Sequence, residues 1–250
     1  MAQAGNGQRV RKDHKPYSMR LLTNFLRAAY TRWYVCPQLD SHGDGLEIIG
    51  PHRLEIWGDD IHLGANVHIQ TAKGKMSRLC TWPNADGGRG KIIIGDNVLL
   101  TPGLHIVSAA SIEIGDAVMI ASNVYISDAD WHDIYDRTAS PGATAPITLE
   151  RNVWLGEGVK LCKGVRIGEN SVIGAGSVVT GDIPANVIAA GNPARVIRPL
   201  QAGRAISGRE TMFADRAAYE KTMKYLHWLN HKDNSFFGWL RQMVRPGRKG

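Results

Sequence analysis

The sequence has few cysteines and no apolar run long enough to cross a membrane. Its three cysteines, Cys36, Cys80 and Cys162, are widely spaced and form no CxxC pair. This spacing excludes a disulfide framework and a zinc ribbon, and it predicts three reduced thiols. No segment approaches the ~20 apolar residues of a membrane span, and residues 1–16 lack the apolar core of a secretory signal. We therefore expect a globular, cytoplasmic protein, with contact at the membrane surface left open.

Nucleic-acid-binding motifs are also missing. The formal net charge of +7 comes from the two ends of the chain. Residues 1–35 carry seven Lys/Arg against one acid, residues 198–250 carry eleven against four, and the span between them is net acidic. Nucleic-acid-binding proteins usually place such charge beside a helix-turn-helix, RNP or zinc-finger motif, and none occurs here. We expect no nucleic-acid partner.

A six-residue repeat fills the middle of the chain. An aliphatic residue returns every six positions at Leu149, Leu155, Leu161, Ile167, Ile173 and Val179. A small or β-branched residue follows four positions after each of them. The same register occurs at Ile114, Ile120 and Ile126, at Ile94, Leu100 and Ile106, and more faintly at Trp57, Leu63 and Ile69. A period of six marks neither a single helical stripe nor a plain strand alternation.

We interpret each hexad as a short strand with one inward aliphatic residue, followed by a corner. Gly and Asn are frequent at these corners because they tolerate positive φ. Three hexads close a triangular turn of about eighteen residues, and stacked turns bury a column of Leu, Ile and Val. The alternative, a β-sandwich, would need longer strands and turns about 8–12 residues apart. The expected fold is an all-β parallel β-helix with helical extensions at both ends.

Residues 152–197, NVWLGEGVKLCKGVRIGENSVIGAGSVVTGDIPANVIAAGNPARVI, carry a resemblance to a known family. They resemble the hexapeptide-repeat acyltransferases, in the branch of the maltose and galactoside O-acetyltransferases and the acetyltransferases of surface-polysaccharide synthesis. The resemblance implies a left-handed β-helix, acetyl-CoA as the acyl donor, and a C3 homotrimer with its active sites between subunits. We expect a basic N-terminal segment with an amphipathic helix (1–45), the β-helix acyltransferase domain (46–198) and a basic helical extension (199–250).

Two interruptions of the repeat mark loops, which is where a solenoid forms sites. One loop covers residues 73–91, and the other lies between Ile126 and Leu149 and holds His132. Transfer of an acyl group to a hydroxyl needs a base near neutral pH, and imidazole, with an ordinary pKa of about 6.5, suits this role. The resembled family has its base on the loop before the VWIG-type hexad, which implies His132 as the general base.

Asp128, Asp130 and Asp133 flank His132 and are candidates to orient its imidazole. A purely structural His132 is the alternative. Zinc catalysis is a second alternative, because other β-helix enzymes bind zinc through histidines. However, the six-residue spacing puts His62 and His68 on different faces, and no second histidine accompanies His132 in its loop. We expect no metal.

The resemblance also implies donor-binding residues. Trp154 matches a tryptophan near the thioester, Ala175 and Thr180 match positions along the pantetheine arm, and Arg195 and Arg198 match basic residues that reach the nucleotide phosphates. A lone tryptophan can instead cap a coil. Gly181, where relatives often have lysine, and Glu157, where a small polar residue is common, depart from the pattern.

Acceptor identity does not follow from the resemblance, because the N-terminal segment is unrelated and Thr101 stands where an asparagine is expected. Loop 73–91 is the expected source of acceptor contacts. It offers Trp82, Asn84, Asp86 and Arg89, and aromatic and amide groups suit a sugar, although an unstructured glycine-rich loop is the alternative.

The ends carry amphipathic segments. Residues 16–34 place an apolar stripe at helical spacing, formed by Met19, Leu22, Phe25, Leu26, Ala29 and Trp33. Residues 209–230 have a similar pattern. We expect the first stripe to cap an open end of the β-helix, and contact with an anionic membrane interface is the alternative. For the last sixteen residues, an aromatic and basic segment, packing on a neighbouring subunit and peripheral contact with the inner face of the membrane are both open.

The predicted function is transfer of an acetyl or short acyl group from acyl-CoA to a hydroxyl of a sugar or surface-glycan precursor. His132 would act as general base and no covalent acyl-enzyme is expected, because neither Cys80 nor Cys162 neighbours a histidine. N-acylation of an amino sugar and a non-catalytic β-helix interaction protein are the alternatives.

Overall fold

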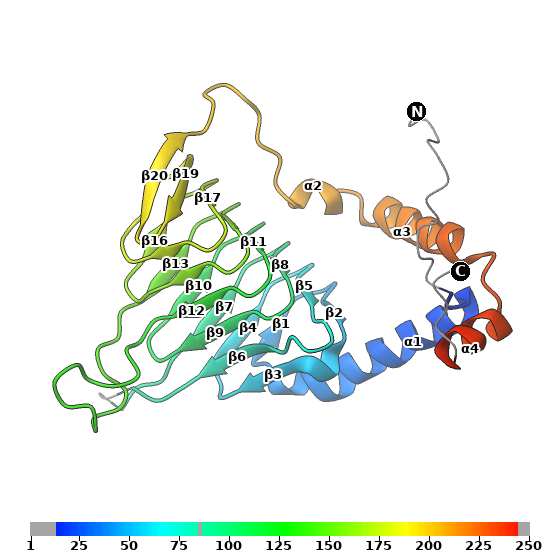
Figure 1. Cartoon of the computed structure of the whole chain (residues 1–250), viewed down its shortest axis with the longest axis horizontal. Coiled ribbons are helices and arrows are strands. Elements are labelled where there is room, and N and C mark those ends of the chain that lie inside the picture. Colours follow the sequence, from blue (N-terminus) through cyan, green and yellow to red (C-terminus); the bar gives the residue numbers. More distant parts are fainter. Residues whose placement is uncertain (1–13, 85–86, 245–250) are drawn as a thin grey trace. The chain divides into compact units, whose positions relative to one another are not determined.

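The computed structural model describes residues 14–84 and 87–244 (Figure 1). The chain forms two compact units: Arg27–Ala214, and the described residues of Met1–Leu26 together with those of Asp215–Gly250. The predicted domain boundaries at 45/46 and 198/199, which mark the expected ends of the repeat region, stay predictions. The N-terminal residues 1–13, Asp86, and the basic residues Arg245, Arg248 and Lys249 lie outside the described residues.

The unit Arg27–Ala214 is a parallel β-helix of three sheets, which the chain visits in a fixed order (Figure 1). Sheet A stacks β1 (Ser41–His42), β4 (Ile61–Leu63), β7 (Ile92–Ile94), β10 (Ile112–Ile114), β13 (Ile147–Leu149) and β16 (Arg166–Ile167). Sheet B stacks β2 (Glu47–Ile49), β5 (His68–Gln70), β8 (Leu99–Leu100), β11 (Met119–Ile120), β14 (Trp154–Leu155), β17 (Val172–Ile173), β19 (Val187–Gly191) and β20 (Ala194–Pro199). Sheet C stacks β3 (Leu54–Trp57), β6 (Ser77–Thr81), β9 (His105–Ser108), β12 (Tyr125–Ser127), β15 (Lys160–Leu161) and β18 (Val178–Val179).

Each coil therefore has three corners, which stack into an A–B edge, a B–C edge and a C–A edge. Described strand pairs are parallel up to β19, and β20 turns back antiparallel to β19. The six-residue repeat accounts for this arrangement, because one hexad supplies one strand and one corner.

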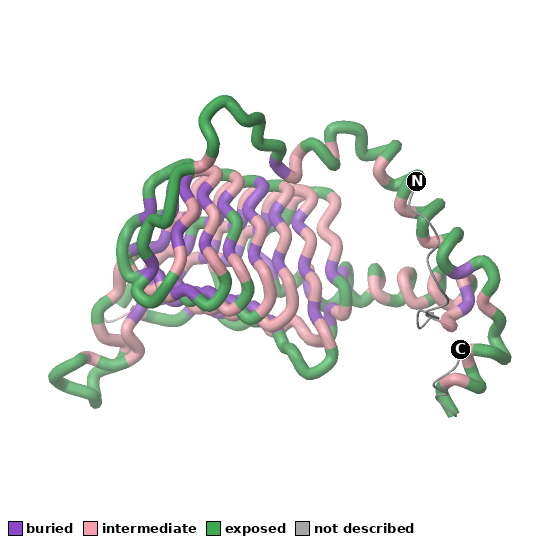
Figure 2. The backbone as a smooth tube through the Cα atoms, turned by 45° about the horizontal axis from the view of Figure 1, so that its top comes forward, coloured by how far each residue is buried: buried purple, intermediate pink, exposed green. Residues whose placement is uncertain are grey.

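The predicted inward column is confirmed. The aliphatic residues at the six-residue spacing from Leu149 to Val179 are at most 1% exposed. They align across neighbouring coils, as Ile120 with Leu155 and Leu155 with Ile173. Figure 2 shows buried and partly buried positions alternating along the stacked coils. The core is one continuous column of Leu, Ile and Val.

The first coil departs from the predicted register. The repeat predicts an inward Trp57, but the side chain of Trp57 is 58% exposed. Ile56 takes the inward place, because it aligns with Leu79 and packs against the core. The corner that follows contains one more residue than a plain hexad, which moves Trp57 to the outside of the C–A edge.

The predicted loop 73–91 is wrong in part. Residues Ser77–Thr81 form strand β6, and Leu79 is buried in the core column. The excursion from the coil begins at Trp82 and ends at Lys91, and a bridge between Pro83 and Arg89 closes it. We call the described residues of 82–91 the hairpin. The sequence did not indicate this strand, because the inward positions of Ser77–Thr81 do not fit the six-residue register of the neighbouring hexads.

The N-terminal helix forms as predicted, and the capping role expected of its apolar stripe stays a prediction. Helix α1 (Tyr17–Tyr30) continues into a π-helical turn η1 (Thr31–Val35) and a 3₁₀ turn η2 (Cys36–Gln38), and a second 3₁₀ turn η3 (Pro51–Arg53) precedes β3. Val35 and Leu39 join the hydrophobic core. Phe25 and Trp33 of the predicted stripe are largely exposed.

The segment after β20 runs back along the A–B edge. The backbone N–H of Leu200 donates to the carbonyl of Asn186, Arg209 Nε donates to the carbonyl of Asn97, and the ring of Phe213 in helix α2 (Glu210–Phe213) lies edge-on to His68. These contacts descend from the last coil to the second. We call residues 199–214 the strap.

Helices α3 (Arg216–His231) and α4 (Phe236–Val244) belong to the other unit. Asp215 caps α3 by accepting a hydrogen bond from the N–H of Ala218. Within the unit, Arg20 of α1 contacts His231 at 3.1 Å and Asn234 donates to the carbonyl of Lys15. No described helix is both long and apolar enough to cross a bilayer.

Candidate active site

Both interruptions of the repeat leave the β-helix at the C–A edge. The hairpin follows β6, and the loop 128–146 follows β12, closed by a bridge between Ala129 and Thr144. The two lie side by side (Figure 1), with the rings of Trp82 and Trp131 6.4 Å apart between centroids. His132 is therefore part of a two-loop surface on one edge.

Asp128 fixes the base of the His132 loop and does not orient His132. Its carboxylate is fully buried and accepts hydrogen bonds from Ser108 Oγ (2.6 Å), from the N–H of Ala109 (2.7 Å) and from the N–H of Ala110 (3.0 Å). These donors belong to the corner of the preceding coil, so Asp128 ties the loop to the β-helix.

The other two flanking acids also serve the loop. Asp130 pairs with Lys163 at 2.7 Å. Hydrogen bonds from the backbone N–H groups of Asp136 and Tyr135 hold the pKa of Asp133 below its usual value. His132 itself is exposed, and no group in residues 14–84 and 87–244 hydrogen-bonds its ring. The expectation that one of these acids orients His132 is therefore wrong within one subunit.

A close backbone approach sets the position of His132. A Cβ on Gly142 would lie 2.5 Å from the carbonyl oxygen of His132. The return of the loop brings these segments together through hydrogen bonds between the backbone of Asp130 and those of Gly142 and Ala143. Gly142 is thus required for close packing beneath His132.

Trp154 points outward from the middle of sheet B, 48% exposed, while its neighbour Leu155 is buried. It lines a cavity of about 630 Å³ between sheet B and the strap. Met119 and Val172 form the apolar floor, and Arg198 and Arg204 line the same cavity. The structure therefore brings two predicted donor-binding residues, Trp154 and Arg198, to one cavity and adds Arg204, which the sequence motif did not indicate.

The remaining predicted donor residues lie nearby on the last coils but do not line this cavity. Ala175 is exposed at the B–C edge, and Thr180 is exposed after β18 at the C–A edge. Arg195 lies on β20, opposite Ala190, and its guanidinium donates to the carbonyl of Ala194. These residues could line an extended substrate along the last coils, but they do not form one pocket in the single chain.

His132 and Trp154 lie on opposite sides of one subunit. The chain passes through sheets A, B and C in turn, so the C–A edge is opposite the face of sheet B. Trp154 projects from that face, and His132 from that edge. A site containing both residues therefore needs two subunits.

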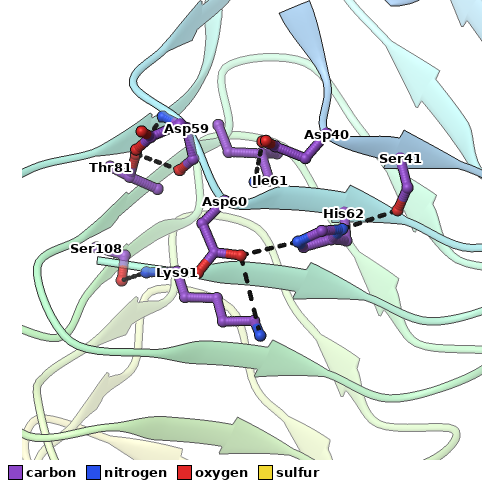
Figure 3. Close-up of polar contacts among 9 residues, drawn as sticks. All are labelled: Asp40, Ser41, Asp59, Asp60, Ile61, His62, Thr81, Lys91 and Ser108. Atoms are coloured by element: carbon purple, nitrogen blue, oxygen red, sulfur yellow. Dashed lines mark hydrogen bonds and ion pairs between the residues drawn. The ribbon is translucent and has the colours of Figure 1, made fainter. Parts of the chain in front are cut away.

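A second polar group on the C–A side was not found from the sequence. Ser41 Oγ lies 2.8 Å from His62 Nδ1, and His62 Nε2 lies 2.8 Å from Asp60 Oδ1 (Figure 3). This group joins the first two strands of sheet A. This contact could not be predicted without knowing which strands are neighbours, because Ser41 and His62 are 21 residues apart.

The other histidines are separated by the fold. His68 lies on sheet B, where burial lowers its pKa and Glu47 opposes that shift. His105 lies on sheet C, where burial and Arg78 lower its pKa. Among the described residues, no three His, Cys, Asp or Glu side chains gather as a metal site.

Comparison with family models gives two matches within the β-helix. Residues 146–181 match the bacterial transferase hexapeptide model, described as six repeats. Residues 91–128 match the hexapeptide repeat of succinyl-transferase. The two matches flank the His132 loop.

Curated relatives match a little under half of the chain. The chain is 48% identical over 111 residues to galactoside O-acetyltransferase of Escherichia coli (strain K12), across 44% of this chain and 54% of that protein. It is 38% identical over 122 residues to the putative lipopolysaccharide biosynthesis O-acetyl transferase WbbJ of the same strain, across 44% of this chain and 62% of that protein. The chain thus spans little more than half the length of these relatives.

Among solved structures, the chain resembles a mutant of AntD, an N-acyltransferase from Bacillus cereus, in complex with dTDP-4-amino-4,6-dideoxyglucose and coenzyme A. The TM-score is 0.54 at 21% identity, across 74% of this chain and 92% of that one. This likeness concerns the fold alone. The fold is the left-handed parallel β-helix with helical extensions that the repeat and its resemblance predicted.

Proposed function

The chain belongs to the hexapeptide-repeat acetyltransferase family, and from this premise we propose that it is an enzyme that acetylates a sugar hydroxyl. The donor is acetyl-CoA, and the acceptor is a sugar or surface-glycan precursor. The observation that carries the proposal is the exposed His132 ring on a loop that Asp128 anchors to the β-helix. The activities of the curated relatives support the same class of reaction.

The chemistry needs one base and one oxyanion donor. His132 takes the proton from the acceptor hydroxyl as its oxygen attacks the thioester carbonyl. A backbone N–H of the Trp154 coil stabilises the tetrahedral oxyanion, a contribution of roughly 3 kcal/mol when the donor is preorganised. The intermediate then expels the coenzyme A thiolate, which receives the proton from the His132 imidazolium. The acetyl ester and the free thiol are the products.

The donor occupies the surface that Trp154 marks. The cavity beside Trp154 has an apolar floor that suits the pantetheine arm and two arginines, Arg198 and Arg204, that suit phosphates. Arg195, Ala175 and Thr180 extend the donor surface across the last coils. Gly181 adds no cationic side chain to this surface, so the arginines provide the charge that meets the phosphates.

The active protein is a homotrimer in this proposal. One subunit places His132 and Trp154 on opposite sides, so the base of one subunit meets the donor surface of the next. A C3 arrangement repeats this junction three times and closes the ring of subunits.

The test of the base is His132→Ala. We expect acetyl transfer to fall by at least about a hundredfold, because the base is lost while the donor surface is intact. Calorimetry should show unchanged coenzyme A binding. His105→Ala is the matched control, since His105 is another outward histidine on sheet C, 6.5 Å from Tyr125 between ring centroids. Near-normal turnover of His132→Ala would remove His132 from the reaction, and failure of the unaltered protein to bind coenzyme A would favour a non-catalytic β-helix.

The nature of the acceptor is tested by consumption of acetyl-CoA against sugars, amino sugars and lipid-linked glycans. Release of coenzyme A with sugars that carry only hydroxyl groups supports O-acetylation. Turnover confined to amino sugars would replace it with N-acylation, which uses the same base and donor.

The proposal includes peripheral contact with an anionic membrane surface through the C-terminal segment. In α4, Phe237 is 80% exposed and Met243 is also exposed, beside Arg241. Basic residues near an anionic surface contribute about 1 kcal/mol each. Co-sedimentation with anionic vesicles should therefore be salt-sensitive and should disappear in a chain truncated after Asn234. If truncation lowers the melting temperature and leaves vesicle binding unchanged, α4 packs on protein instead.

A further inference from the structure

Three tryptophans form a row along the C–A edge that ends at His132. Trp57 ends β3, Trp82 opens the hairpin, and Trp131 precedes His132 in its loop. Ring centroids are 6.2 Å apart between Trp57 and Trp82, and 6.4 Å apart between Trp82 and Trp131. Trp57 and Trp82 are 58% and 43% exposed. Three large aromatic rings thus lie in a row over the first four coils, and much of the surface of Trp57 and Trp82 is open.

Polar groups accompany these rings. Arg89 Nη1 donates to Asp59 Oδ1 at 2.6 Å. The backbone of Asp59 is held in turn by Thr81 Oγ1, which accepts from its N–H and donates to its carbonyl (Figure 3). At the far end of the row, Trp57 and Asp59 line a cavity of about 340 Å³ together with Gln38 and Asp40. The edge therefore offers carboxylates, a guanidinium and an amide next to aromatic faces.

We infer that this edge is the acceptor-binding track of the enzyme and that the acceptor is an oligosaccharide. Sugar rings have apolar faces that pack on aromatic rings and hydroxyl groups that bind carboxylate, amide and guanidinium groups. Neighbouring strands are about 4.8 Å apart, so the three spacings from the Trp57 coil to the His132 coil measure about 14 Å. A single sugar ring cannot reach from the cavity beside Trp57 to His132, whereas a chain of several sugars can.

The inference rests on the proposed function, because that function makes His132 the end of the track at which the acceptor reacts. Oligosaccharide binding can nevertheless be tested without catalysis. The experiment is binding of the full chain to a glycan array of neutral and charged mono- to hexasaccharides. We expect affinity to rise with chain length up to the number of sugars that the track holds. Trp57→Ala and Trp82→Ala should each weaken binding of the preferred oligosaccharide about fivefold to tenfold, as expected for loss of one aromatic contact.

Matched variants show whether the aromatic faces themselves bind the sugar. Trp82→Phe should restore most of the binding, because it keeps an aromatic face. Trp33→Ala should bind as the unaltered protein does, because the exposed ring of Trp33 lies against Arg32 and is not one of the row. His132→Ala should lower acetyl transfer much more than oligosaccharide affinity, whereas Trp57→Ala and Trp82→Ala should lower the affinity itself, so that a failure of the proposed base and a failure of the track give different results. Melting temperatures close to that of the unaltered protein show that the variants are folded.

Three outcomes would overturn the inference. One is affinity that does not depend on the number of sugars. Another is unchanged oligosaccharide binding in Trp57→Ala and Trp82→Ala. The third is competition at the track by ADP, which would assign the aromatic row to a nucleotide base instead of a sugar.

Discussion

At the scale of single residues, the acids around His132 show that a cluster typical of a catalytic site can instead stabilise the loop that carries the proposed catalytic residue. Three aspartates near a histidine suggest a catalytic relay, but the structure gives all three of them local roles. Asp128 binds the preceding corner, Asp130 pairs with Lys163, and Asp133 accepts from the backbone of its own turn. These contacts hold the loop, and through the loop backbone they hold His132.

Asp128→Ala should therefore be one of the most destabilising changes in the loop. It leaves the N–H groups of Ala109 and Ala110 and the hydroxyl of Ser108 without their buried acceptor. At about 1–3 kcal/mol for an unsatisfied buried group, we expect a loss of at least about 3 kcal/mol in the free energy of unfolding. Urea denaturation measures it. Asp128→Asn keeps an acceptor oxygen and should lose less, and equal losses for both variants would show that the hydrogen bonds do not matter.

At the scale of elements, the corners decide how the coils stack. Asn66, Asn97, Asn152, Asn170 and Asn186 all adopt positive φ at the A–B edge. Their side chains form hydrogen-bonded ladders, as from Asn152 to Asn170 and from Asn170 to Asn186. Ala117 occupies the same place between Asn97 and Asn152, with φ of 58°. It interrupts the ladder and has a conformation that L-residues other than Asn and Asp rarely adopt.

Ala117 is 1% exposed, so Ala117→Gly loses the burial of one methyl group, about 0.8 kcal/mol, while it relieves the strain of positive φ, about 1–2 kcal/mol; we expect a net change close to zero or slightly stabilising. The matched control is Ala189→Gly, at a fully buried position in strand β19. There glycine should cost about 1 kcal/mol or more, from lost burial and greater freedom of the unfolded chain. Thermal unfolding of the two variants gives the comparison. A loss at Ala117 as large as that at Ala189 would mean that the corner conformation carries no strain.

Much of the β-helix could be predicted from the sequence because each hexad determines its own strand and corner. The inward column from Leu149 to Val179 follows directly from that period. The errors occur where the register is set by more than one hexad: Trp57 moved outward beside a one-residue addition, and β6 was hidden inside an expected loop. His132 could be located through its loop, but the partners of Asp128 and Asp130 lie 18 to 33 residues away. Such contacts depend on which coils are neighbours.

The aromatic row on the C–A edge illustrates the same limit. Trp57, Trp82 and Trp131 belong to three segments with no common motif. They become neighbours only because β3 and β6 pair in sheet C and the His132 loop brings Trp131 back to the hairpin. Of these three tryptophans, the sequence indicated only Trp82 as an acceptor contact. The row as a whole required the stacking of the coils.

At the scale of the whole molecule, the proposed active site needs a second subunit. His132 extends from the C–A edge, and Trp154 extends from the opposite face of sheet B. In a C3 trimer, each site then takes the base from one subunit and the donor surface from the next. This arrangement predicts that two inactive variants can complement each other, because the damaged residues belong to different subunits of one site.

The test is to co-express His132→Ala and Trp154→Ala in equal amounts. Each variant alone should form trimers without an intact site. In mixed trimers, a site is intact when its base comes from the Trp154→Ala chain and its donor surface from the His132→Ala chain. Random assembly of equal amounts makes about one quarter of the sites intact, so acetyl transfer should recover to about a quarter of the unaltered level. Mixing the purified variants without subunit exchange is the control and should recover nothing. Activity of the co-expressed pair no higher than the mean of the two parents, or an active monomer by light scattering, would place both residues in a site within one subunit.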